Sequence, residues 1–136
     1  MFLHFLHKKE HKEAFIELAH LVAKADGFLH RKEQGYLRAY WDELELSAAD
    51  YQFDTVRELS EIIGDLQDEQ VKNIFLVEIL LLTFADGDYN DAEKQITQEM
   101  KRLFGYSDEI YETYRDWVIR MDKLKIEGMR LILDPS

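Results

Sequence analysis

The feature of this sequence that most constrains its fold is a pattern that occurs twice, 60 residues apart. Ala25-Asp26-Gly27 is followed by Glu33, and Ala85-Asp86-Gly87 is followed by Glu93. Apolar side chains on both sides keep the same spacing, in the pairs Phe15 and Phe75, Leu21 and Leu81, Tyr36 and Ile96, Tyr40 and Met100, and Leu44 and Phe104. Such self-similarity predicts a duplicated helix–loop–helix unit. We expect its copies at about residues 11–64 and 71–121, packed around one pseudo-symmetric core.

The spacing of apolar residues predicts helices throughout the chain. These residues recur every three or four positions, which is the period of an amphipathic helix. The only proline is Pro135, so no proline breaks a helix upstream of it. We expect a central buried helix at about 71–85, a helix at 107–121 and a short last helix at 123–133. The sequence therefore predicts one all-α domain over residues 1–136, a compact bundle of about seven helices.

The charge of the chain limits what it can bind. It carries 28 acidic and 17 basic side chains, a net charge of −11 with histidine neutral. Such a field repels nucleic acid and anionic lipid surfaces, because binding to them depends on Lys and Arg. The same field attracts cations and basic protein partners. We therefore expect a protein partner and no nucleic acid.

Membrane insertion and catalysis also lack support in the sequence. The longest apolar run, residues 74–85, is about a dozen residues long, whereas a membrane-spanning helix needs roughly 20. The chain has no cysteine, and no phosphate-binding loop or serine nucleophile motif occurs. We expect a cytoplasmic protein that is not an enzyme and does not insert into membranes.

The repeated turn has two interpretations. In the structural one, glycine ends the first helix, and Asn90 with Glu93 forms a capping box at the start of the next. In the chemical one, carboxylates of the turn hold a hard cation, Ca²⁺ or Mg²⁺ rather than Zn²⁺. The candidate ligands are Asp26, Glu33, Asp86, Asp88, Asp91 and Glu93. The second turn is the better candidate, because it has four carboxylates and no basic residue. An EF-hand is excluded, since Leu82 and Phe84 would occupy two of its ligand positions.

At these residues the sequence resembles the tellurite-resistance TerB-like family, which includes the N-terminal domain of a membrane-anchored J-domain co-chaperone. The resemblance rests on the two A-D-G…E motifs and covers about residues 11–121. It implies an all-helical duplicated fold with such a motif after the first helix of each unit. It also implies a metal-associated, stress-linked module that acts through protein partners, with no established catalytic activity. The first turn departs from the pattern, because Arg31 and Lys32 lie where a cation site would prefer acids.

Two functions remain open at this point. One is an acidic, non-enzymatic stress-response module of the TerB-like kind that binds a divalent cation at the second turn. The alternative is a protein-interaction scaffold or co-chaperone-type domain in which the A-D-G…E turns are purely structural. Tyr111, Tyr114 and Trp117 have the spacing of a buried helix face. Any part of them left exposed would be a partner surface, because Tyr and Trp dominate interface hot spots.

Overall fold

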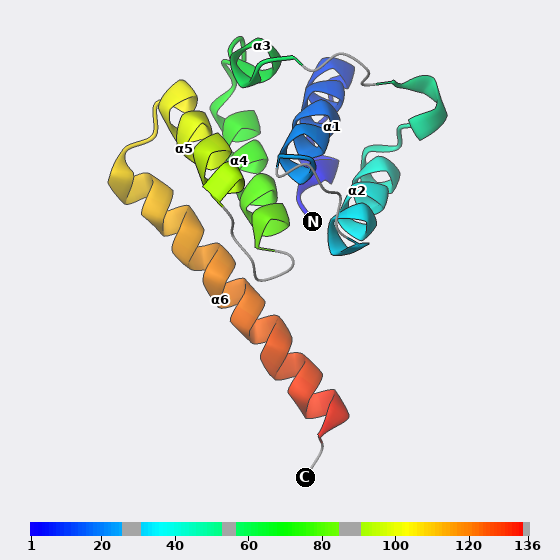
Figure 1. Cartoon of the computed structure of the whole chain (residues 1–136), viewed down its shortest axis with the longest axis vertical. Coiled ribbons are helices and arrows are strands. Elements are labelled where there is room, and N and C mark those ends of the chain that lie inside the picture. Colours follow the sequence, from blue (N-terminus) through cyan, green and yellow to red (C-terminus); the bar gives the residue numbers. More distant parts are fainter. Residues whose placement is uncertain (26–30, 53–56, 85–90, 135–136) are drawn as a thin grey trace.

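A computed structural model describes residues 1–25, 31–52, 57–84 and 91–134, and of residues 31–33 only the backbone. The described residues form helices and no strand, so the predicted all-α bundle is confirmed (Figure 1). None of the described helices is long and apolar enough to cross a membrane. The elements in chain order are η1 (Leu3–Phe5), α1 (Lys9–Ala23), α2 (Arg31–Leu44), η2 (Ala48–Asp50), α3 (Leu59–Ile63), α4 (Glu69–Thr83), α5 (Asp91–Phe104) and α6 (Asp108–Leu133), where η marks a 3₁₀ helix.

The C-terminal helix differs from its prediction. The separate helices expected at 107–121 and 123–133 form one helix, α6, which is 26 residues long. Nothing between Met121 and Lys123 ends a helix, since neither proline nor glycine occurs there. The first half of α6 packs on α4, and the second half extends beyond the bundle (Figure 1). The described residues therefore contain six α-helices instead of seven.

The core lies where α1 packs against α4. Phe15 of α1 and Phe75 of α4 are fully buried, and their rings meet edge to face with centroids 5.3 Å apart. Tyr40 of α2 meets Phe15 in the same way, with centroids 5.2 Å apart. α4 also packs against α5 and α6. This central position explains why residues 74–82 of α4 are all apolar except Glu78.

The helix boundaries repeat at the 60-residue spacing of the sequence pattern. α1 and α4 span residues 9–23 and 69–83, and α2 and α5 span 31–44 and 91–104. The turns after α2 and α5 are alike as well. Glu45 and Gly105 both have a left-handed backbone, with φ of 59° and 76°. In both turns the N–H of the following residue donates to the carbonyl five residues before it, which is the Schellman arrangement. These equal boundaries are what a duplicated unit requires.

The turn after α2 carries a strain that the turn after α5 avoids. We expect Glu45→Gly to raise the free energy of unfolding by about 1 kcal/mol, because a left-handed backbone costs a side chain roughly that amount. Glu45 is exposed, so the substitution removes no buried contact. Gly105→Ala should lower the free energy by a similar amount, since an added Cβ meets no atom within 4 Å and only the backbone is penalised. Urea denaturation measures both, and equal stability of Glu45→Gly and wild type would contradict the prediction.

Candidate functional site

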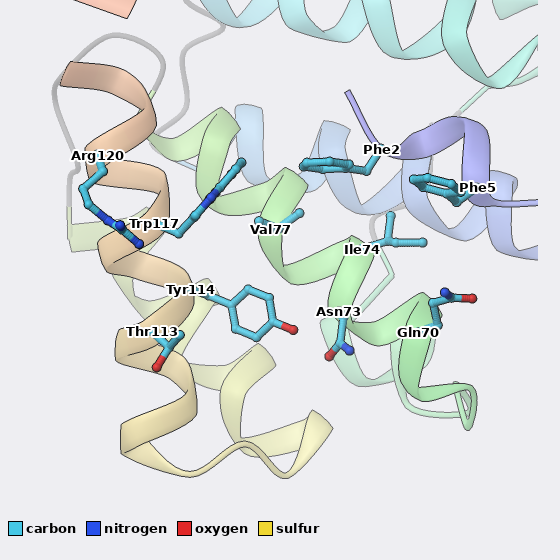
Figure 2. Close-up of a pocket in the computed structure, with 10 residues that line it drawn as sticks. All are labelled: Phe2, Phe5, Gln70, Asn73, Ile74, Val77, Thr113, Tyr114, Trp117 and Arg120. Carbon is cyan, nitrogen blue, oxygen red and sulfur yellow. The ribbon is translucent and has the colours of Figure 1, made fainter. Parts of the chain in front are cut away.

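An apolar groove lies between the N-terminal segment, α4 and α6 (Figure 2). Its volume is about 460 Å³. Phe2 and Phe5 come from the N-terminal segment, Ile74 and Val77 from α4, and Trp117 from α6. The remaining lining residues are polar: Gln70, Asn73, Thr113, Tyr114 and Arg120. The groove thus joins segments that are far apart in the sequence.

Burial of two leucines places the aromatic rings of the N-terminal segment. Leu3 and Leu6 are buried in the core, and η1, which begins at Leu3, packs against α2. The rings on either side of Leu3 are left to line the groove. Phe2 meets Trp117 there, with ring centroids 5.9 Å apart, and Phe5 is 52% exposed. Phe2 and Phe5 therefore face the groove because the buried leucines next to them fix the position of the N-terminal segment.

Two carboxylates hold the start of the chain. The Phe2 backbone N–H donates to Glu78 Oε1 at 2.6 Å. The Met1 ammonium lies 2.7 Å from Glu43 Oε1 and 3.3 Å from Glu78 Oε1. Burial raises the pKa of Glu78, although the Phe2 N–H and the ammonium partly offset this. Partial burial alone would also raise the pKa of Glu43, but hydrogen bonds from the ammonium and His4 outweigh it, so that pKa is lowered. The ionised form is therefore favoured at Glu43 and disfavoured by burial at Glu78.

The polar margin of the groove is made of neutral groups and one cation. Asn73 Oδ1 accepts a hydrogen bond from the Tyr106 hydroxyl at 2.5 Å. Tyr106 packs against Tyr114 with ring centroids 6.0 Å apart, and burial raises the pKa of both phenols. Arg120 is exposed at the end of the groove nearest the free half of α6. The described lining includes no His, Cys, Asp or Glu. Such a surface suits the binding of an apolar segment with a polar or acidic edge.

The predicted cation site falls mostly outside the described residues. Asp26, Asp86 and Asp88 lie there, and so does the side chain of Glu33. Of the other two candidates, Asp91 is exposed at the first residue of α5, whereas Glu93, two residues further into the same turn of helix, is buried. Within the described part of the chain, no three potential ligands lie together in a metal-binding arrangement. The cation site stays a prediction, and calorimetric titration with Ca²⁺ and Mg²⁺ is its test.

The sequence indicates only part of the groove. The spacing of Tyr114 and Trp117 predicts a helix face whose exposed part could contact a partner, and both residues are half-buried and line the groove. The sequence does not single out Phe2 and Phe5, because the eight residues before α1 are too few to show a helical periodicity. One signal was present. Glu78 is a lone carboxylate within an apolar run, and such a group needs a buried partner.

Comparisons with known proteins add no relative. No family model matches the chain, and neither a curated protein nor a solved structure matches it. The resemblance to the TerB-like family therefore stays an expectation that rests on the two A-D-G…E motifs.

Proposed function

We propose that this chain is a non-enzymatic protein-interaction module that binds an apolar helical segment of a protein partner in the groove. The observation that carries the proposal is the groove itself, which is lined by Phe2, Phe5 and Trp117. Aromatic side chains in a concave, partly desolvated surface are the usual anchors of an interface. In a cytoplasmic, TerB-like setting, such a module would act in a stress response through its partner, as a co-chaperone-type domain does.

The shape of the surface favours a helix over a compact ligand. A second concavity of about 330 Å³ follows along α6 and shares Trp117 and Arg120 with the groove. The two together make an elongated surface that is open to solvent. An amphipathic helix places apolar side chains on one face at spacings of three and four residues, and so fills an elongated apolar groove. Arg120 would face an acidic residue at the edge of that helix.

Selection from a displayed library of amphipathic helical peptides tests the proposal. We expect wild-type protein to enrich peptides with apolar residues at i, i+3 or i+4, and i+7. Phe5→Asp should weaken binding of the enriched peptides by about tenfold or more, because it puts a charge into the apolar surface. Phe5 is 52% exposed, so the fold tolerates the change.

Ile110→Asp is the matched control for this substitution. Ile110 is an apolar residue of similar exposure, 47%, and lies outside the groove. The Ile110→Asp variant should bind the peptides as wild type does. Enrichment of no helical peptide, or equal loss of binding in both variants, would contradict the proposed function.

A further inference from the structure

The apolar surface of α6 continues past the groove as a stripe. Tyr114, Trp117, Met121, Leu124, Gly128 and Leu131 follow one another at alternating steps of three and four residues. This is the spacing of a helix seam that packs against another helix. Tyr114, Trp117 and Met121 are half-buried against the bundle, whereas Leu124 is 62% exposed and Leu131 is 76% exposed. Half of the seam therefore has no cover within the described chain.

The uncovered half of the seam is continuous with the groove. The second concavity is lined by Trp117 and Arg120, which also line the groove, by Met121, and by three residues of the free half of α6, namely Lys123, Leu124 and Glu127. A helix lying along this seam would therefore contact the free half of α6 at one end and reach the groove at the other.

We propose that a second copy of this chain covers the seam, with the two α6 helices packed antiparallel about a two-fold axis. This inference rests on the proposed function, because it names the helix that the groove receives. The seam matches itself when reversed: Met121 meets Leu124 of the second copy, Trp117 meets Gly128, and Tyr114 meets Leu131. The axis then passes between residues 122 and 123, where side chains of α6 become exposed.

The sizes of the paired residues fit this register. The largest side chain of the seam, Trp117, faces its only glycine, Gly128. A Cβ added at Gly128 meets no atom of its own chain within 4 Å, so the space above that glycine is open. Leu131 of the second copy lies beside Tyr114, at the groove. In this register the two bundles lie at opposite ends of the helix pair.

The charges along the seam also fit. Arg120 and Glu127 lie two turns apart on one helix, about 10 Å, too far to pair with each other. In the antiparallel pair, Arg120 of each copy lies near Glu127 of the other. At longer range, residues 120–133 carry four basic and two acidic side chains, whereas the rest of the chain carries 13 basic and 26 acidic ones. The basic half of α6 is therefore attracted to the acidic bundle of the second copy.

Charge reversal tests the register. Sedimentation velocity of the full chain at rising concentration should show a monomer–dimer equilibrium. Arg120→Glu or Glu127→Arg alone should raise the dimer dissociation constant roughly tenfold, because each places two like-charged pairs at the interface. The double variant should return it to near the wild-type value, since both pairs are restored with reversed sign. Failure of the double variant to recover dimerisation would overturn the register.

A pair of glycine substitutions separates the interface from the stability of the helices. Gly35 in α2 and Gly128 in α6 both have open space at the Cβ position. Gly35→Leu and Gly128→Leu should both favour their helix. Only Gly128→Leu should abolish the dimer, because its side chain occupies the place of Trp117 from the second copy.

Two further outcomes would reject the dimer. The first keeps the proposed function, and the second can overturn it. A chain that stays monomeric but still binds the selected peptides, and loses them with Phe5→Asp, has a groove for another protein. A monomer that instead binds vesicles of phosphatidylglycerol through α6 uses its exposed leucines and basic residues on a lipid surface. Vesicle binding by a monomer that binds no helical peptide would overturn both the dimer and the proposed function.

Discussion

Phe75→Ala is expected to lower the free energy of unfolding by about 3–5 kcal/mol, which is the cost of removing a fully buried phenyl ring. Phe75 is the centre of the contact between α1 and α4, and its ring packs edge to face on Phe15 at 5.3 Å. No small movement of one helix can fill the cavity, because α5 and α6 hold α4 on its other sides. Chemical denaturation followed by circular dichroism measures the loss.

The counterpart substitution gives this prediction its control. Phe15→Ala should cost a similar amount, because Phe15 occupies the same position in the first unit and is equally buried. The double variant should lose less than the sum of the two, since each single variant already removes their shared contact. Full additivity, or a small effect at Phe75 beside a large one at Phe15, would contradict a core shared equally by the two units.

Leu3→Ala is expected to cost about 2–5 kcal/mol and to weaken binding at the groove as well. Leu3 is fully buried, and it anchors the segment that carries Phe2 and Phe5. When the anchor is lost, the two rings are no longer held beside Trp117. Denaturation measures the first effect, and titration of a selected helical peptide measures the second.

A buried residue away from the groove distinguishes the two effects. Ile63 in α3 is buried to the same degree and does not line the groove. Ile63→Ala should therefore destabilise the protein comparably and leave the peptide affinity of the folded protein unchanged. Equal affinity in the Leu3→Ala and Ile63→Ala variants would mean that the N-terminal segment has no part in binding.

The fold was largely predictable because its information is local and repeated. The 60-residue spacing of apolar pairs such as Phe15 and Phe75 predicts the paired helices, and their boundaries repeat at that spacing. The break expected near Asp122 was wrong, because no proline or glycine occurs there and the helix continues through it. Apolar spacing alone does not show where a helix leaves the bundle.

The site was less predictable because it depends on contacts between distant residues. The hydrogen bond from Phe2 to Glu78 joins positions 76 residues apart. Nothing in the local sequence of either residue specifies the other. Trp117 was recognisable as part of a helix face, but its neighbour across the groove was not. The acidic turns are visible in the sequence because their charges are neighbours along the chain, whereas the groove forms only when distant segments pack together.

The most direct test of the groove as the binding site uses the two tryptophans of the chain. Trp117 lines the groove, whereas Trp41 in α2 packs near His20 and Tyr51. Each gives one indole N–H signal in a proton–nitrogen correlation spectrum. When a selected helical peptide is added, the account predicts that the Trp117 indole signal shifts in proportion to binding and that the Trp41 signal stays in place. Binding that shifts Trp41 and leaves Trp117 unchanged would contradict it.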